Sequence, residues 1–176
     1  MQKLSREFYE QSTLEVAKEL IGKVMVFDSF EGVITETEAY IGKDDPACHA
    51  ARGKTKRNEV MFARAGTSYV YLIYGMYHCL NFVTEEEGFP AAVLIRGVYI
   101  PQIDYKRTNG PGKLCKIMDI TKQQNGVDIV ESNDFYVLDK GIKLDYDTTT
   151  RIGISQGKEL PWRFVVDKQK ISKIPG

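Results

Sequence analysis

Glu38 and Tyr40 are two residues apart in a stretch whose residue types could do chemistry, residues 32–42 (GVITETEAYIG). In a β-strand, residues i and i+2 lie on the same face, about 7 Å apart along the strand. A carboxylate beside an aromatic ring could hold a water molecule against a sugar carbon while the ring holds the attached planar group. The same pattern also fits a half-exposed strand with its acids toward solvent, so the stretch leaves both interpretations open.

A second stretch, residues 69–82 (YVYLIYGMYHCLNF), has four tyrosines in its first nine positions. Its aromatic and β-branched residues predict a hairpin of strands 68–74 and 77–83, because Gly75 supplies the backbone angles that a tight turn requires. We therefore expect Tyr74 at the tip, with Tyr69 and Tyr71 on one strand face. Aromatic residues are common in strands, which explains Tyr69 without any function but does not explain an exposed ring at the tip.

Basic residues are unevenly distributed, although the formal net charge is zero, with 24 Lys or Arg and 24 Asp or Glu. Between residues 43 and 116 there are eleven basic and seven acidic residues, whereas residues 128–147 hold six acids and two lysines. The densest basic run suits phosphate contacts and consists of Arg52, Lys54, Lys56 and Arg57. Taken alone, this run is more simply explained as a solvated loop.

Histidines and cysteines give no sign of a metal site. His49 is one of only two histidines, and no Cys or His lies at metal-ligand spacing from it. The three cysteines are far apart and include no Cys-x-x-Cys pair, so we expect them to be reduced and mostly buried. No apolar run has the length of a signal peptide or of a membrane-spanning helix. We therefore expect a soluble, intracellular protein with one domain over residues 1–176.

The elements that must position these side chains predict an α+β fold with a mainly antiparallel sheet. A capping-box pattern from Ser12 to Glu15 opens a short helix that Gly22 ends, and a second helix is expected around Leu114 and Met118. Segments rich in β-branched and aromatic residues between turn signals are expected to be strands, at 23–27, 33–41, 68–74, 77–83, 91–100, 135–138 and 162–166.

Six segments together resemble a known family, and they occur in the family's order: FYEQSTLEVAKELIGK, TETEAYIGKDDPACHAARGKTKRNEVMF, AGTSYVYLIYGMYHCLNFV, AAVLIRGV, NGPGKLC and RIGISQGKELPWRFVV. This family is the alkyladenine DNA glycosylases, also called methylpurine or 3-methyladenine DNA glycosylases, of the mammalian type. The segment GPGK alone would be a weak signal, because Leu114 follows it where a phosphate-binding loop has Ser or Thr.

The resemblance implies a base-excision repair enzyme with a curved sheet, a protruding hairpin and flanking helices. In such an enzyme a damaged purine is flipped out of the duplex, and Tyr74 would fill the gap from the minor groove. Tyr40 on one side, with His49 and Tyr71 on the other, would hold the flipped base. Electron-rich ring faces suit alkylated purines that carry positive charge. Asn81 would crowd the amino group of normal guanine.

The resemblance also implies the chemistry. Glu38 would activate a water that attacks C1′ of the sugar, with Arg96 and the backbone at Val166 as further contacts. No lysine matches a Schiff-base nucleophile, so the expected enzyme is a monofunctional hydrolase that leaves the strand intact. It would need no metal or cofactor and would act as a monomer on double-stranded DNA containing a damaged purine. Its expected location is with the DNA, in the bacterial cytoplasm and nucleoid or in a eukaryotic nucleus.

Two other functions compete with this reading. A non-catalytic nucleic-acid binding module would use the aromatic hairpin and the basic run but would not need Glu38 beside Arg96. A hydrolase of free nucleosides would share the acid–base chemistry but would gain nothing from Tyr74 at an exposed tip. The chain also departs from the family between Arg96 and Gly110, where members usually carry a longer connection with DNA contacts.

Overall fold

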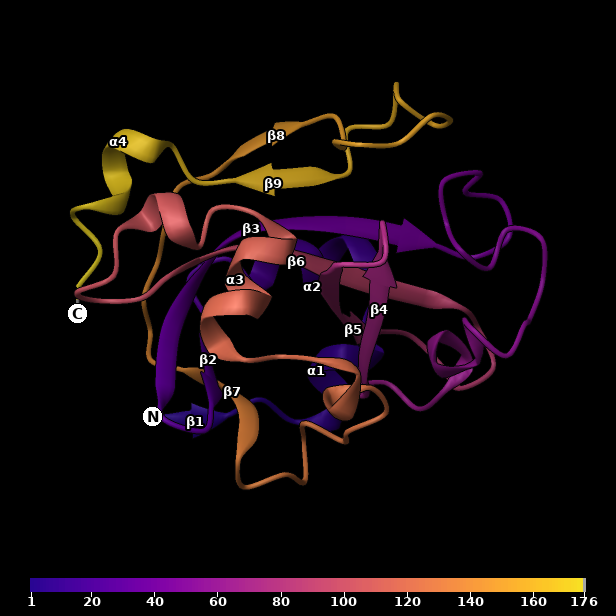
Figure 1. The fold of residues 1–176 in the computed structure, drawn as a ribbon, viewed down its shortest axis with the longest axis horizontal. Helices are drawn as coiled ribbons and strands as arrows, with labels where there is room; N and C mark the ends of the chain where they lie inside the picture. The colour runs from indigo at the N-terminus through magenta and orange to yellow at the C-terminus, as the bar shows by residue number, and fades with distance from the viewer. Residues whose placement is uncertain (176) are drawn as a thin grey trace.

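The structure, a computed structural model that describes residues 1–175, is built on one nine-stranded sheet (Figure 1). The strand order is β1-β7-β2-β3-β6-β5-β4, and β9 pairs with both β3 and β8. All of these strand pairs are antiparallel. Helices accompany the sheet rather than alternate with its strands, which confirms the α+β prediction.

The strands are β1 (Gln2–Lys3), β2 (Val24–Phe27), β3 (Phe30–Ile41), β4 (Ser68–Ile73), β5 (Tyr77–Val83), β6 (Ala91–Tyr99), β7 (Phe135–Asp139), β8 (Asp147–Thr149) and β9 (Arg163–Val165). The α-helices are α1 (Arg6–Glu10), α2 (Thr13–Glu19), α3 (Pro111–Met118) and α4 (Lys168–Ile171). Three short 3₁₀ helices are η1 (Glu59–Phe62), η2 (Tyr105–Arg107) and η3 (Lys122–Gln124).

The predicted strands are all present, with ends that differ by at most a few residues. The elements that the sequence did not predict are β1, α1, β8 and α4, which are too short to carry a recognisable periodicity. The prediction of a capping box was wrong. Ser12 is the N-cap residue of α2 but makes no side-chain capping bond. The Thr13 N–H donates to the Glu85 carboxylate at 3.2 Å.

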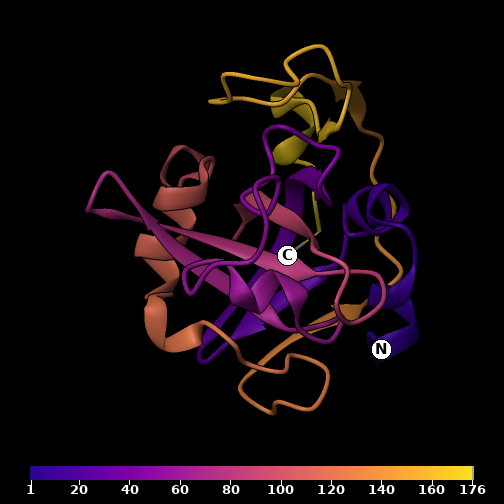
Figure 2. The ribbon, with the colours of Figure 1, turned by 90° about the vertical axis from the view of Figure 1, so that its right-hand side faces the viewer.

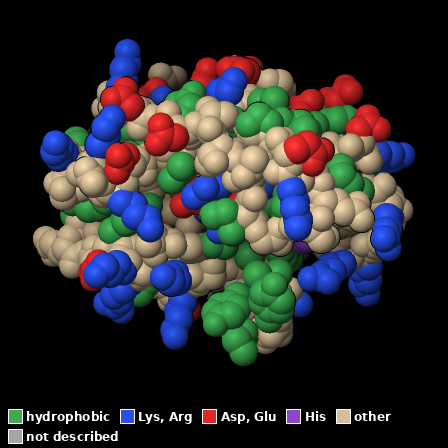
Figure 3. Space-filling model, turned by 90° about the horizontal axis from the view of Figure 1, so that it is seen from above, with side chains coloured by type: hydrophobic (Ala, Val, Ile, Leu, Met, Phe, Trp, Pro, Cys, Tyr) green, Lys and Arg blue, Asp and Glu red, His purple; other side chains and the backbone are tan. Residues whose placement is uncertain are grey.

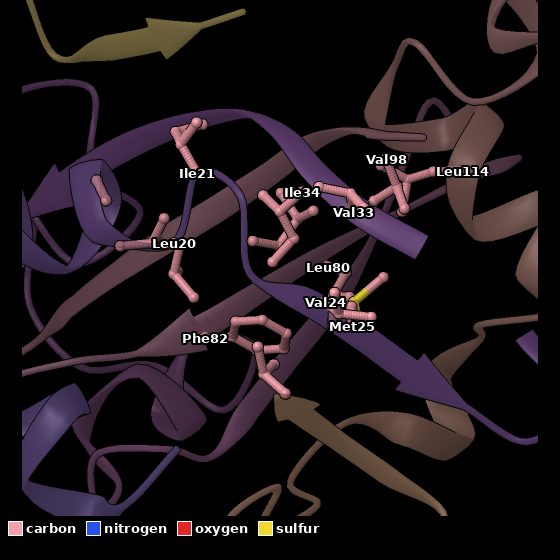
Figure 4. Packing of buried hydrophobic residues seen from close by; sticks show 14 of the residues in the cluster. Leu20, Ile21, Val24, Met25, Val33, Ile34, Leu80, Phe82, Val98 and Leu114 are labelled. Atoms are coloured by element: carbon pink, nitrogen blue, oxygen red, sulfur yellow. The ribbon is translucent and has the colours of Figure 1, made fainter. Parts of the chain in front are cut away.

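Helices cover both faces of the sheet, with α3 in front and α2 behind in the view of Figure 1. The main core joins apolar residues of α2, β2, β3, β5, β6 and α3 (Figure 4), among them Leu20, Ile34, Leu80, Phe82 and Leu114. Cys48, Cys79 and Cys115 are free and buried, as expected. No helix within residues 1–175 is both long and apolar enough to cross a membrane.

Strand β3 is the element that the site depends on most. Its first half pairs with β2 and its second half with β9 along one edge, while β6 pairs along the other edge. The register against β6 shifts between Ile34 and Thr37, and such irregularities bend a strand and re-aim its side chains. Strict alternation along the strand would place Ile34 on the same face as Glu36 and Glu38, but Ile34 belongs to the main core.

The β4–β5 hairpin extends beyond the body of the protein, at the left of Figure 2. Its turn closes with the Met76 N–H donating to the Ile73 carbonyl at 3.1 Å. Tyr74 and Gly75 both have positive φ, 51° and 67°. Glycine adopts this conformation at no cost, but an aromatic residue rarely does, so the turn holds the Tyr74 ring outward under backbone strain.

Candidate active site

A cavity of about 460 Å³ lies between the sheet and two loops. Its walls come from β3, β4, β5, β6, the first turn of α3 and the segments 46–49 and 152–155, and the lining residues include Tyr40, Pro46, Ala47, His49, Met61, Tyr69, Tyr71, Tyr74, Cys79, Asn81, Arg96, Pro111 and Ile152. The volume falls within the range of small-molecule sites in proteins. Most of the residues predicted for the site from the sequence therefore meet here.

Glu38 lies behind the cavity wall, with a side chain that is 0% exposed. Its Oε2 accepts a hydrogen bond from the Tyr40 hydroxyl at 2.8 Å, and its Oε1 accepts one from the Ile152 N–H at 3.0 Å. The Arg96 Nε lies 3.2 Å from the same Oε1. Both carboxylate oxygens are thus held, and Tyr40 and Arg96 line the cavity whereas Glu38 does not.

A second carboxylate, Glu36, adjoins Glu38. Its Oε1 accepts from the Arg96 Nε at 3.2 Å and from the Arg163 Nε at 2.7 Å. The Arg96 guanidinium therefore contacts both carboxylates, Glu36 and Glu38. The Arg163 guanidinium neutralises Glu36. The network orders Arg96 from behind, so its position at the cavity wall is fixed before any ligand binds.

Burial raises the pKa of Glu38 above its ordinary value, because the charged form loses hydration. Arg96, the Ile152 N–H and the Tyr40 hydroxyl lower the pKa in opposition, and Glu36 adds a smaller upward effect. The net direction is upward. A carboxylate whose pKa is raised holds a proton more readily than an exposed Glu, which suits a general base.

Aromatic rings form the sides of the cavity. The His49 and Tyr71 rings have centroids 4.4 Å apart, and Tyr69 and Tyr71 have centroids 5.3 Å apart. The His49 Nδ1 lies 3.1 Å from the Tyr69 hydroxyl. Burial, with a further contribution from Arg57, lowers the pKa of His49, so the ring is neutral at pH 7. The cavity therefore offers uncharged π surfaces on the His49 side and the Tyr40 side.

Asn81, on β5, lines the cavity and is almost fully buried. Its Nδ2 donates to the Tyr69 carbonyl oxygen at 3.1 Å. An amide anchored in this way has a fixed position and cannot easily move aside for a larger ligand. It is thus placed to act as a steric limit at the cavity wall.

The hairpin tip carries the most exposed hydrophobic side chains near the cavity, Tyr74 at 86%, Met76 at 66% and Tyr77 at 47%. Figure 3 shows hydrophobic side chains projecting at the lower edge of the molecule, with Lys and Arg side chains to both sides. Arg57 of the predicted basic run donates from Nη2 to the Leu72 carbonyl at 3.0 Å, which ties that loop to the hairpin. Arg52, Lys54 and Lys56 belong to the same loop.

Val166, whose backbone is expected to contact the water, keeps that role as a prediction. It does not line the cavity, and its N–H donates to the Thr35 carbonyl at 2.9 Å as part of the sheet. The backbone group that reaches Glu38 belongs to Ile152. The segment 152–155 was missed because its contribution includes a backbone N–H, which every residue but proline has, so residue type gives no signal.

Residues 1–175 contain no group of three His, Cys, Asp or Glu side chains that could hold a metal ion. The donors around the cavity are one fully buried carboxylate, a neutral imidazole, phenols and a guanidinium. This set can bind a planar, electron-poor ligand and move a proton.

Comparisons with known proteins agree with the resemblance seen in the sequence. A family model described as methylpurine-DNA glycosylase (MPG) matches residues 7–170. A protein of Rickettsia felis, provisionally named a 3-methyladenine DNA glycosylase, is 60% identical over 163 residues, covering 93% of this chain and 92% of that protein. An Ehrlichia chaffeensis protein with the same name is 58% identical over 166 residues, with 93% and 92% covered.

A third relative with that name, from Rickettsia bellii, is 47% identical over 212 aligned residues, covering 96% of each chain. That alignment is longer than the 176 residues of this chain, so the Rickettsia bellii protein contains inserted residues. The 163-residue alignment with the Rickettsia felis protein leaves no room for a long insertion. The short connection between β6 and α3 is thus shared by a relative, and here it contains η2.

Proposed function

Since the chain belongs to the methylpurine-DNA glycosylase family, we propose that it is a monofunctional glycosylase that removes alkylated or deaminated purines from duplex DNA. The damaged nucleotide would be flipped into the cavity, and a water activated by Glu38 would hydrolyse the N-glycosidic bond. The observation that carries the proposal is the fully buried Glu38, held by three groups behind an aromatic-walled cavity. The expected product is an abasic site in an intact strand.

The position of the water follows from the contacts of Glu38. A carboxylate oxygen has two acceptor sites, and Oε1 already faces the Ile152 N–H and the Arg96 Nε. Oε2 accepts only from the Tyr40 hydroxyl and so has a free acceptor site. A water that donates to Oε2 would lie beside Tyr40, on the side where the sugar of a stacked nucleotide would be placed.

In the reaction the bond between C1′ and the purine nitrogen breaks, and its electron pair leaves with the base. The water oxygen bonds to C1′, and one water proton passes to Glu38 Oε2. A purine that carries a positive charge from alkylation becomes neutral as it leaves, so it is a better leaving group than a normal purine. The adjacent Arg96 favours the ionised form of Glu38 and so opposes the rise in its pKa that burial causes.

Selection of the base would rest on the two aromatic sides and on Asn81. Rings of Tyr40, His49 and Tyr71 stack favourably on electron-poor purines. The anchored amide of Asn81 would collide with the 2-amino group of guanine, which the alkylated adenines lack. Rejection of a normal base thus accompanies attraction of a damaged one.

Extrusion of the nucleotide would depend on the hairpin tip and the adjoining basic loop. Tyr74 is exposed and held outward, so it can enter the space that a flipped nucleotide leaves. Arg52, Lys54, Lys56 and Arg57 would contact phosphates beside the lesion. The protein would act as a monomer wherever the DNA of the cell is.

No lysine lines the cavity among the residues that the structure describes, which favours water over a Schiff-base nucleophile. A glycosylase with a lysine nucleophile would cleave the strand as well as release the base.

The deciding experiment measures free base released from a duplex oligonucleotide with one 3-methyladenine or hypoxanthine, beside the corresponding free nucleoside. We expect release from the duplex, none from the nucleoside, and strand breaks only after alkali treatment. Release from the nucleoside alone would support a nucleoside hydrolase, and binding without release a non-catalytic module. Strand cleavage without alkali would contradict the monofunctional mechanism.

A further inference from the structure

Arg151 forms a buried ion pair that the mechanism above does not use. Its Nη1 and Nη2 donate to the two carboxylate oxygens of Asp45 at 2.6 and 2.9 Å, and both side chains are 0% exposed. The guanidinium lies between two rings, 4.8 Å from the Tyr40 centroid and 5.0 Å from the Trp162 centroid. Removing two charges from water is costly, so such a pair needs a reason beyond stability.

Residues 151 and 152 contact three consecutive residues of β3. The Ile152 N–H donates to Glu38 Oε1 at 3.0 Å, Arg151 Nη1 donates to the Ala39 carbonyl at 3.0 Å, and the guanidinium stacks on the Tyr40 ring. Tyr40 lines the cavity and Arg151 does not, so the cation supports the ring from behind. The Tyr40 ring and the Glu38 carboxylate are therefore positioned by one anchor, which consists of residues 151 and 152.

Asp45 extends this anchor to the loop that carries His49. Its carboxylate also accepts the Ile41 N–H at 3.2 Å and the Ala47 N–H at 3.1 Å, so it is surrounded by donors. The chain from Pro46 to His49 lines one part of the cavity, and the chain from Ile152 to Ser155 lines another. The Arg151–Asp45 pair joins the bases of these two segments.

We propose that Arg151 is a positioning residue for base excision, which fixes Glu38 and Tyr40 relative to each other through its bonds to Asp45 and β3. The inference rests on the proposed function, because it assigns Arg151 a part in that reaction. Arg151 touches neither the base nor the water. It acts by keeping the Ile152 N–H on Glu38 and the Tyr40 ring in its plane.

A second arginine–aspartate ion pair in the same chain gives a control, with Arg6 buried and the Asp128 side chain 38% exposed. Arg6 donates from Nη2 to Asp128 at 2.7 Å and from Nη1 to the Ala65 carbonyl at 2.7 Å, with a side chain that is 8% exposed. Like Arg151, it pairs with an aspartate and a backbone carbonyl, but it lies on α1 and does not line the cavity. Arg6→Lys therefore measures how much an Arg→Lys substitution at an ion pair lowers stability away from the candidate active site.

Arg151→Lys keeps the charge but loses the planar fork that reaches Asp45 and Ala39 together. We expect it to fold, with a lowered melting temperature like that of Arg6→Lys. Displacement of supporting groups by about 1 Å commonly costs about 100-fold in rate, so single-turnover base release should fall about 10- to 100-fold. Arg6→Lys should leave the rate of base release within about twofold of wild type, because substitutions at distant sites act independently.

The titration of Glu38 gives a readout that needs no activity. The titratable and charged groups that face it are Arg96 on β6, Glu36 and Tyr40 on β3, the Cys79 thiol on β5 and Arg151 itself. A lost or lengthened bond from the Ile152 N–H destabilises the carboxylate, so the pKa of Glu38 rises further. The acid limb of the rate profile should then move to higher pH.

The experiment compares wild type, Arg151→Lys and Arg6→Lys by melting temperature, single-turnover base release from pH 4 to 8, and carbon-13 NMR titration of Glu38 in the free protein. A slower Arg151→Lys with an upward shift of the Glu38 titration supports the inference. A wild-type titration in Arg151→Lys, with only a lowered melting temperature, overturns it. An equal loss of rate in Arg6→Lys also overturns it.

If the wild-type protein releases no base, the proposed function fails, and the Glu38 titration still decides whether Arg151 positions the carboxylate. If Arg151→Lys does not fold, Gly157→Ala takes its place, since the added carbon would lie 2.9 Å from Arg151 Nη2. Gly141→Ala is its control, with a similar positive φ and nothing within 4 Å. Only Gly157→Ala should shift the Glu38 titration, and a shift in neither variant overturns the inference.

Discussion

The two ends of the candidate active site are built in opposite ways. At its base, Glu38 is fully buried and contacted by Tyr40, Arg96 and Ile152, which come from three separate parts of the chain. At its mouth, Tyr74 is 86% exposed and sits on a turn with positive φ. Under the proposed function, proton transfer gains from groups that are fixed in advance, and a side chain that enters a DNA stack has to project from the protein surface.

Because of this difference, we expect substitutions at the two ends of the site to affect stability and function differently. Substitutions at the base disturb packed and hydrogen-bonded groups, so they affect both the fold and the chemistry. Substitutions at the tip remove almost no contact within the protein and, under the proposed function, would act on the DNA step alone. Substitutions at each end and the pH dependence of base release test whether the buried end and the exposed tip differ in this way.

Glu38→Gln should have the largest effect, lowering single-turnover base release by about 10²- to 10⁴-fold, because an amide cannot accept the proton of the water. Lesion-containing DNA should still bind, since the aromatic walls are unchanged. Stopped assays of base release beside a binding titration check this. Activity near the wild-type value would show that Glu38 takes no part in the reaction. The buried end of the site would then have no special catalytic role.

Tyr74→Ala should slow release of a well-paired lesion by about 10- to 100-fold, since one stacking contact is worth about 1–3 kcal/mol. A lesion opposite a gap or in single-stranded DNA costs less to extrude, so its release should change much less. The melting temperature should stay near that of wild type, because the ring is exposed.

Single-turnover rates on paired and unpaired lesions, with a melting curve, test the Tyr74 prediction. The exposed position already shows that the ring is not part of the core. An equal loss on every substrate with a clear drop in melting temperature would mean that the tip, like the base, supports the fold.

The pH dependence of base release should show an acid limb from Glu38. Burial raises the pKa of this group above 4.5, so the ionised base is lost as pH falls through that raised value. Below it the rate should fall about tenfold per pH unit. The limb should be absent from the residual activity of Glu38→Gln, measured on the same charged lesion, and a limb at or below pH 4.5 would contradict the upward direction.

Asn81→Ser should give the smallest change, a widening of substrate range. Removing the amide enlarges the cavity, so mismatched or undamaged guanine should be excised a few times faster than by wild type, which corresponds to about 1 kcal/mol at the transition state. Competition between a guanine-containing duplex and a hypoxanthine-containing duplex measures the ratio. No gain on guanine in a folded variant would place the discrimination elsewhere.

Much of the fold was predictable because its signals are local. The hairpin strands were placed correctly at Ser68–Ile73 and Tyr77–Val83, since alternating aromatic residues around Gly75 leave few other conformations. The neighbours Glu38 and Tyr40 were expected on one face, and the Tyr40 hydroxyl does bond to Glu38. The capping box at Ser12 failed, since Ser12 makes no side-chain capping bond, and Glu85, distant in sequence, bonds to the Thr13 N–H in the first turn of the helix.

The sequence by itself determined the residue types of the site, the strand that carries Glu38 and Tyr40, and the tip that carries Tyr74. Each depends on neighbours within a few positions, so periodicity and turn residues suffice. Tertiary structure alone brings Ile152, 114 residues from Glu38 in the sequence, into a hydrogen bond with it and brings Arg151 to Asp45. Those contacts depend on how distant segments are brought together, and a backbone N–H or a buried ion pair has no local pattern to announce it.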